Sequence, residues 1–252
     1  MRLQGKVACI TGAGQDIGRA IAVQFAQEGA IVLLNDIWHS DTLSHLVAEI
    51  GIFAQQASII DGDVTSETEV KRMLESSLQI YQHIDIWVNA ATGAQFAGVE
   101  PEASGLHAYT EEERFRRLLH IDVKGTFVCC RAIAPIMQAQ GSGCIINMSW
   151  DAALIEGATG MDYCIFAAAK GAVHSLSMSL AREYAPTVRV NVIAPGSINA
   201  SSLYPHMAEQ KSPLGRFCTP DDVAQTALYL ASPQSSYITG QTVVVNGGSI
   251  MF

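Results

Sequence analysis

A glycine-rich turn near the N-terminus is the first candidate for chemistry in this sequence. Gly12, Gly14 and Gly18 lie between an apolar stretch and an amphipathic one, which predicts a turn between a strand and a helix. Such a turn lets the backbone approach a pyrophosphate, and the positive end of the helix faces the phosphate charge. Gly12, Gln15, Asp16 and Ile17 are therefore candidate cofactor-binding residues. Glycine spacing alone would also suit an ordinary turn.

Asp36, at the end of the next apolar stretch, makes nucleotide binding the stronger interpretation. A carboxylate at this point accepts hydrogen bonds from a ribose 2′-hydroxyl and repels a 2′-phosphate. No basic side chain stands at Gln15 or Ile37 to hold such a phosphate. The sequence thus favours NAD over NADP, the alternative being that Asp36 is a plain turn residue.

Alternating strands and helices must position these residues. Continuous apolar runs predict parallel strands covered on both faces, and longer amphipathic stretches predict the helices between them. Strands are expected at 6–11, 31–36, up to about 63–64, 84–89, 144–149, 188–193 and 242–245. Helices are expected at 16–28, 41–50, 66–80, 110–139 and 163–184, with a short one after 221. The pattern predicts an α/β fold, a doubly wound parallel sheet of about seven strands with helices on both faces.

Length and composition place limits on function. The 252 residues contain no linker or repeat, so residues 1–252 are expected to form a single domain. A net charge of −9 disfavours nucleic acid as a partner. No apolar run is expected to approach the roughly 20 residues of a membrane-spanning helix, and no signal peptide is expected. Only 15% of residues are charged, which suggests that part of the surface is hidden between subunits.

The cysteines and histidines indicate neither a disulfide framework nor a metal site. The 6 cysteines lack paired or metal-ligand spacing, and the 7 histidines are scattered. Reduced thiols are expected, as in a cytoplasmic protein.

Many short motifs in one order make the whole chain resemble the short-chain dehydrogenase/reductase family. Beyond the first turn, the resemblance is carried by the segments 62–64, 85–91, 124–127, 145–149, 169–173, 189–196, 215–217, 221–224, 238–241 and 245–248. The resemblance implies a Rossmann-type sheet, a nicotinamide cofactor and a homotetramer built on the long helices. The cofactor-binding residues that it implies are Asp63, Val64, Asn89, Ala90, Lys170, Pro195, Gly196 and Ile198.

The sequence departs from this family where its chemistry is done. The family uses a serine, a tyrosine and a lysine, with an asparagine completing a proton relay. Here only Lys170 is plainly retained, because Phe166 stands at the tyrosine position and Asp122 at the asparagine position. Ser149 remains, but Trp150 fills the more commonly catalytic second serine position. Losing a general acid–base typically costs about 10²–10⁴-fold in rate.

Other residues depart from the family pattern as well. Asp16 replaces the middle glycine of the first turn, where it could cap the helix or weaken phosphate binding. The turn after strand 84–89 ends in Ala91-Thr92 instead of the family's Ala-Gly. Asp122 could be a relay residue or a structural polar residue.

Tyr163 is the candidate to replace the missing phenol. Tyr163, Phe166 and Lys170 are spaced i, i+3 and i+7, so a continuous helix places them on one face. The alternative is a tyrosine packed at the start of the helix. Weaker acid candidates are Asp151, Asp162 and His107. The 93–109 loop and a lid near 197–213 are expected to line the substrate pocket.

Two functions from different classes remain open. The first is an NAD-dependent oxidoreductase acting on a small alcohol or carbonyl substrate, with Lys170, Ser149, Tyr163 and Asp122 as its catalytic residues. The second is a catalytically inactive nucleotide-binding or structural subunit of the same fold.

Overall fold

A seven-stranded parallel sheet forms the centre of the computed structural model. The model describes residues 1–37, 41–53, 56–94, 110–154, 157, 161–198 and 212–251, the side chains of 161 and 162 excepted. The strand order is β3-β2-β1-β4-β5-β6-β7, and every neighbouring pair is parallel. The strands are β1 Val7–Thr11, β2 Ile31–Asn35, β3 Ala57–Ile59, β4 Ile86–Asn89, β5 Gly143–Met148, β6 Val188–Pro195 and β7 Thr242–Val245. This arrangement confirms the predicted fold class.

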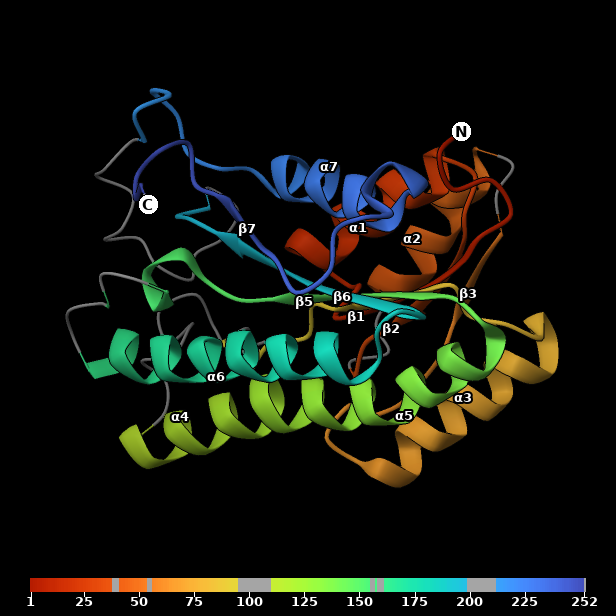
Figure 1. Ribbon diagram of the computed structural model, residues 1–252, viewed down its shortest axis with the longest axis horizontal. Coiled ribbons are helices and arrows are strands. Elements are labelled where there is room, and N and C mark those ends of the chain that lie inside the picture. The colour runs from red at the N-terminus through yellow and green to blue at the C-terminus, as the bar shows by residue number, and fades with distance from the viewer. Residues whose placement is uncertain are drawn as a thin grey trace.

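Helices cover both faces of this sheet (Figure 1). One layer contains α1 Asp16–Gln27, α2 Asp41–Gly51 and α7 Pro220–Ala231. The other contains α3 Glu67–Tyr81, α4 Glu111–Leu118, α5 Thr126–Gln140 and α6 Met161–Glu183. Short helical turns lie at η4 Asp151–Ala153 and η6 Pro233–Ser235.

Successive residues of β1 show how the sheet is buried on both sides. Ala8 and Ile10 pack into the core beneath α1, α2 and α7, whereas Val7 and Cys9 pack into the core beneath α3 and α5. Side chains of a strand alternate between its faces, so a strand buried on both faces needs an unbroken apolar run. Burial on both faces is the reason why the strands appear in the sequence as continuous apolar runs.

The structure corrects two element boundaries. The third strand ends at Ile59 rather than near Asp63, and a loop carries the chain from there to α3. The stretch expected to be one helix from 110 to 139 is α4 and α5 joined by a π-helical turn, η3 Leu119–Gly125. A π turn changes the side-chain spacing along a helix and is frequent at functional sites. Here it contains Asp122.

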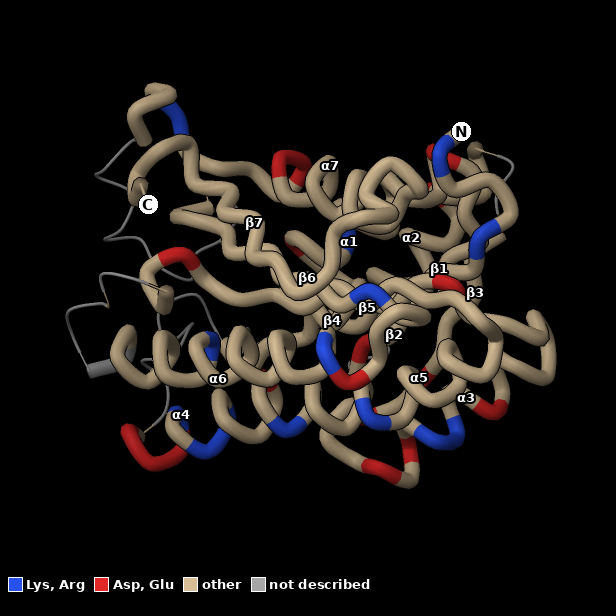
Figure 2. Tube along the Cα trace, in the orientation of Figure 1, with Lys and Arg blue, Asp and Glu red and all other residues tan. Residues whose placement is uncertain are grey.

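Charged residues are sparse along the chain, and α6 carries few of them (Figure 2). By length and hydropathy, Tyr163–Glu183 could cross a membrane, which corrects the expectation that no apolar run is that long. This is weak evidence, because a core helix passes the same test. α6 lies against β5, β6 and η3 and carries the buried Lys170, and 33% of the apolar window is buried within the chain.

All six cysteines are free thiols, and all but Cys164 are buried. Burial raises the pKa of the Cys9 thiol well above its usual range and that of Cys130 to about 12. These thiols are inert core residues. Among the residues that the structure describes, no three side chains are grouped to hold a metal ion.

Candidate active and cofactor site

A cavity of about 290 Å³ opens at the carboxyl ends of the strands, where the chain order reverses between β1 and β4. This is the switch point at which open α/β sheets bind ligands. Of the residues singled out from the sequence, Gly12, Gln15, Asp36, Asp63 and Val64 line it. Its other lining residues are Asn35, Ile37, Thr65, Ala91, Thr92, Arg117, His120 and Ile121.

The glycine turn packs too closely to tolerate side chains. Gly12 has a φ of +66°, and a Cβ there would lie 2.8 Å from the backbone of Ala91. A Cβ on Gly18 would lie 2.0 Å from the Gly12 carbonyl oxygen. The Thr11 hydroxyl ties the turn to the end of β4 by accepting the N–H groups of Ala90 (3.1 Å) and Ala91 (3.2 Å). The result is a backbone cradle of the kind that admits a pyrophosphate.

Asp36 faces this turn from the end of β2. Its Oδ2 accepts the Gly14 N–H at 3.1 Å. The neighbouring Asn35 donates from its amide to the carbonyls of Ile60 (3.0 Å) and Gly62 (2.9 Å), which holds the loop after β3 against β2. In that loop, Asp63 accepts the Thr65 N–H at 2.8 Å. The acidic group expected beside a ribose is thus fixed at the mouth of the cavity.

Asp16 does not cap α1, contrary to one expectation. Gln15 is the N-cap residue and makes no side-chain cap bond, and Asp16 is the first helical residue. Its φ of +46° lies in the left-handed region that favours glycine. Asp16 lines a separate hollow between α1 and α7, together with Arg19 and Gln225. Ile17 is half-buried and packs on the core beneath α1.

Asn89 belongs to a buried polar network at the centre of the sheet. Its Oδ1 accepts the Trp87 indole N–H at 2.8 Å, and its amide donates to Asn147 Oδ1 at 2.7 Å. Asn147 in turn donates to the Ser177 hydroxyl at 2.8 Å. The network links β4, β5 and α6, so it fixes the strand ends that carry the site.

Lys170 and Asp122 form an ion pair that sequence reasoning did not anticipate. Lys170 Nζ lies 2.6 Å from Asp122 Oδ1, and the side chains are 6% and 0% exposed. Nζ also donates to the Met148 carbonyl at 3.3 Å. Asp122 accepts two further bonds, from the Thr92 hydroxyl at 2.8 Å and the Gly93 N–H at 2.7 Å.

Aromatic side chains surround this ion pair. The Phe166 ring lies 5.4 Å from Lys170 Nζ and 5.2 Å from the ring of Trp150, which is itself 6.4 Å from the ring of Tyr163. Ser149 is buried and donates its hydroxyl hydrogen to the Lys170 backbone carbonyl at 2.9 Å. Tyr163 therefore lies on the same helix face as Lys170, with Trp150 packed against both Tyr163 and Phe166.

Gly196, the first residue after β6, lies beside the buried carboxylate of Asp151. Pro195 ends β6, and the Gly196 N–H donates to the Val245 carbonyl at 2.9 Å. Asp151 Oδ2 accepts the Asn246 amide at 3.1 Å and lies 3.1 Å from where a Gly196 Cβ would be. Ile198 pairs with Cys218 in an isolated bridge.

Several predicted features lie outside the described residues. These are the lid segment apart from its ends, most of the 93–109 loop with His107, and the side chain of Asp162.

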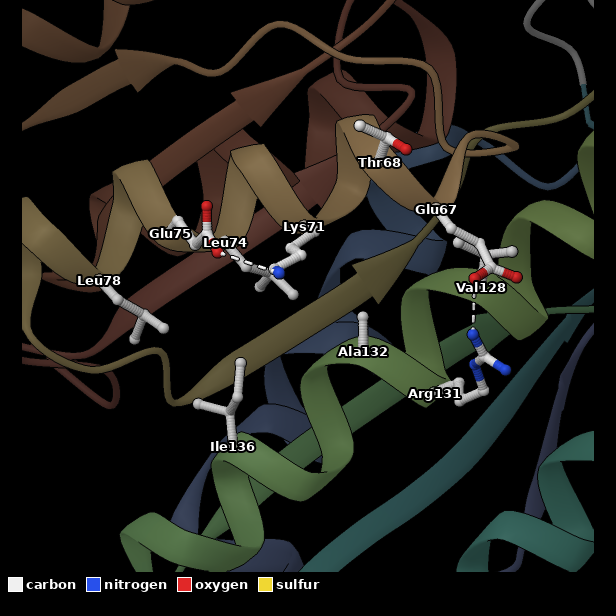
Figure 3. A pocket seen from close by; sticks show the side chains of 10 residues that line it. All are labelled: Glu67, Thr68, Lys71, Leu74, Glu75, Leu78, Val128, Arg131, Ala132 and Ile136. Carbon is white, nitrogen blue, oxygen red and sulfur yellow. Dashed lines mark hydrogen bonds and ion pairs between the residues drawn. The ribbon is translucent and has the colours of Figure 1, made fainter.

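A second hollow, of about 500 Å³, lies on the surface between α3 and α5 (Figure 3). Its floor is apolar, with Leu74, Leu78 and Ile136, and its rim carries the ion pairs Lys71–Glu75 (3.7 Å) and Glu67–Arg131 (2.7 Å).

The doubly wound sheet, the glycine cradle and the acidic end of β2 together define a dinucleotide-binding α/β protein. Residues 12–249 match the family model described as "Enoyl-(Acyl carrier protein) reductase". The 3-oxoacyl-[acyl-carrier-protein] reductase FabG of Thermotoga maritima is 36% identical over 258 residues, with each chain covered fully. The chain belongs to the short-chain dehydrogenase/reductase family, whose named members are oxidoreductases.

Two solved structures resemble this one closely. A 7 alpha-hydroxysteroid dehydrogenase complexed with NADH and 7-oxo glycochenodeoxycholic acid has a TM-score of 0.85 and 32% identity, covering 100% of this chain and 96% of that chain. A gluconate 5-dehydrogenase from Burkholderia cenocepacia J2315, in complex with NADP and tartrate, has a TM-score of 0.84 and 27% identity, with coverage of 98% and 96%. Relatives thus bind either nicotinamide cofactor.

Proposed function

We propose that this protein is an NAD-dependent oxidoreductase that transfers a hydride between nicotinamide and a small alcohol or carbonyl substrate. The observation that carries the proposal is the strand-end cavity, with Asp36 at its mouth and the Gly12 turn as its wall. A Cβ at Gly12 would clash with the backbone of Ala91, and a Cβ at Gly18 would clash with the Gly12 carbonyl. The turn therefore requires glycine at both positions, as a pyrophosphate-binding turn does. Among the described residues that line the cavity there is no lysine, although Arg117 is one of them, and Asp36 would repel a 2′-phosphate.

The cofactor would supply or accept the hydride, and the protein would place the reactants. The proposed cofactor-binding set comprises Gly12, Gln15, Ile17, Asp36, Asp63, Val64, Asn89, Ala90, Lys170, Pro195, Gly196 and Ile198. Asp16 is left out of it, because it lines the hollow on the α7 side. Lys170 would hold the nicotinamide ribose, and Ser149 would orient the substrate oxygen after turning from its bond to the Lys170 carbonyl. Tyr163, or a water beside it, would carry the proton.

The same proposal covers the molecule's organisation. Residues 1–252 form one domain. The protein assembles as a homotetramer in the cytoplasm and has neither nucleic acid nor a membrane as a partner. Its low charge content supports the assembly, and its net charge of −9 disfavours nucleic acid.

The first test is a titration with NADH and, separately, NADPH, followed by quenching of tryptophan fluorescence. Trp150 lies against the catalytic helix, so bound nicotinamide should quench it. NADH is expected to bind at least about tenfold more tightly than NADPH, the worth of one charged hydrogen bond gained or lost. Binding of neither nucleotide would end the oxidoreductase proposal.

A nucleotide-binding protein without turnover is the second candidate. It is favoured by Phe166, which has no proton to give, and by Ser149, whose hydroxyl is bonded to the helix. The Tyr163→Phe variant separates the two candidates once a screen of small ketones and alcohols finds a substrate. An oxidoreductase that uses Tyr163 should lose at least about tenfold in rate with NADH affinity unchanged. Tight NADH binding with no turnover of any compound supports the second candidate.

A further inference from the structure

The ion pair between Lys170 and Asp122 gives the buried lysine a counter-charge, although Phe166 stands at the tyrosine position. Both side chains are almost completely buried, and their charged atoms are 2.6 Å apart. A buried ammonium without a counter-charge is very unfavourable, so its partner determines whether it stays charged and in place. Phe166 offers only the face of its ring, at 5.4 Å, and cannot accept a conventional hydrogen bond from Nζ.

Asp122 is held in position independently of the lysine. Both its oxygens accept hydrogen bonds from the turn after β4, one from the Thr92 hydroxyl and one from the Gly93 N–H. Thr92 takes the place where the family usually has glycine, so a second substitution supports the carboxylate. The π turn at Leu119–Gly125 carries Asp122, and η3 lies against α6. Three elements thus converge on a fixed negative charge beside Nζ.

We propose that Asp122 neutralises Lys170 and is matched to Phe166: it supplies the negative charge and the hydrogen-bond acceptor that a phenolate at position 166 would provide. Asp122 is thereby a positioning residue that acts through Lys170. The lysine still orients a ligand through its remaining N–H, but the pair presents no net charge to acidify a nearby phenol. Restoring tyrosine alone would therefore not restore an acidic phenol.

This inference deepens the proposed function, since it assigns proton transfer to a group other than the Lys170–Asp122 pair. Its evidence is the geometry of the protein's own side chains. It can therefore be tested without nucleotide or substrate, and its failure can be told apart from failure of nucleotide binding.

The test is the ionisation of the phenol introduced by Phe166→Tyr, measured by near-ultraviolet difference absorbance against pH. In the single variant its pKa should be at or above the ordinary tyrosine value of about 10. In Phe166→Tyr/Asp122→Asn the lysine charge is no longer offset, so the pKa should fall by roughly one to two pH units. Asp122→Asn alone is the spectral reference for the double variant, which removes the native tyrosines from the difference.

Matched variants isolate the effect. Glu75→Gln combined with Phe166→Tyr removes one exposed negative charge on α3 and should leave the phenol pKa unchanged. Phe166→Tyr/Lys170→Met should shift the phenol pKa upward, because Asp122 then acts unopposed. Other titratable groups on surrounding elements, namely Asp151, Tyr163, His120 and Arg117, are the same in every variant and cancel in the differences.

Three results would overturn the proposal. Equal phenol pKa values with and without Asp122→Asn would show that the carboxylate does not offset the lysine. A pKa well below about 10 in the single variant would show that Lys170 acts as an uncompensated charge. Should the Asp122→Asn variants fail to fold, the Lys170→Met pair decides, and an unchanged pKa there overturns the proposal. NADH titration of the same proteins tests the proposed function separately.

Discussion

Two aspartates flank the glycine turn, and the structure gives them different tasks. Asp36 bonds the Gly14 N–H and lines the strand-end cavity, whereas Asp16 lines a hollow on the α7 side. Asp36→Asn removes the repulsive charge and replaces one of the two acceptor oxygens by an amide donor, so the preference for NADH over NADPH should fall at least about tenfold. Asp16→Asn removes the same charge one turn away and should change NADH affinity less than about threefold.

Fluorescence titration of both variants checks this pair of expectations. Asparagine tolerates the left-handed conformation of Asp16, so the substitution tests charge rather than backbone strain. A larger loss of NADH affinity in Asp16→Asn than in Asp36→Asn would mean that the cofactor contacts Asp16 and that its ribose does not lie beside Asp36. The ribose assignment would then be wrong.

At this scale the sequence indicated the residues of the turn and missed the contacts between distant ones. Gly12 and Asp36 could be found because each follows directly from the end of a strand. Arg117 and His120, which also line the cavity, come from α4 and η3, and no local pattern relates a helix residue to a particular strand end. The Lys170–Asp122 contact was unpredictable for the same reason, although both residues were candidates.

The packing of α1 against its preceding turn makes a clear prediction at the scale of elements. An alanine Cβ at Gly18 would lie 2.0 Å from the Gly12 carbonyl oxygen, so Gly18→Ala should cost at least about 3 kcal/mol or prevent folding. Gly171 in α6 is the matched control, since its nearest atom, the Ala153 oxygen, would be 3.8 Å away. Gly171→Ala should gain up to about 1 kcal/mol from helix propensity. Urea unfolding of the two variants distinguishes them, and equal stabilities would contradict the close packing.

The N-terminus of α7 predicts a pH dependence. Arg216 holds Asp222 through two hydrogen bonds (2.5 and 2.8 Å), and Thr219 and Asp222 form a reciprocal capping box. Hydrogen bonds from Arg216, and then from Thr219, lower the pKa of Asp222 well below its usual value. The folded state therefore favours the carboxylate, and this stabilisation is present above about pH 4 and lost as the pH falls further.

Asp222→Ala should accordingly cost about 1–2 kcal/mol at neutral pH, and its difference from the parent should shrink between about pH 5 and pH 2. Asp221→Ala, in the same first turn but outside the capping box, should cost only a few tenths of a kcal/mol. Thermal unfolding across this pH range is the measurement. A penalty at Asp222 that is independent of pH would mean that packing, not its charge, stabilises the helix.

The elements themselves were largely predictable, with one instructive exception. Strands buried on both faces leave continuous apolar runs, so the order of strands and helices could be obtained from periodicity. The π turn at Leu119–Gly125 could not, because it inserts one extra residue into a helical pattern without a residue signature of its own. The apolar run ends at Ile60 and β3 at Ile59, so the expected strand end near Asp63 falls on the polar loop that follows.

For the whole molecule, the scarcity of charge is what the proposed assembly would explain. Only 15% of residues are charged, and Phe127 on α5 is 41% exposed, with Arg131 stacked 5.8 Å above its ring. Beside it lies the apolar-floored hollow between α3 and α5 (Figure 3). Aromatic and arginine side chains that are exposed on a single subunit often form the centre of an interface, where the partner subunit buries them. This helix layer is therefore the expected contact surface of the proposed homotetramer.

Light scattering coupled to gel filtration tests this expectation. The parent should elute with about four times the chain mass of 27.0 kDa. Phe127→Glu places a charge at the expected contact and should produce smaller species at micromolar concentration, because an unpaired charge is costly to bury. Ile52→Glu is the control: Ile52 is 81% exposed and follows α2 in the opposite layer, so the same change should leave the assembly intact.

If the parent is a monomer, the low charge content has another cause. If Ile52→Glu alone dissociates the assembly, the subunits meet through the layer of α1, α2 and α7 instead.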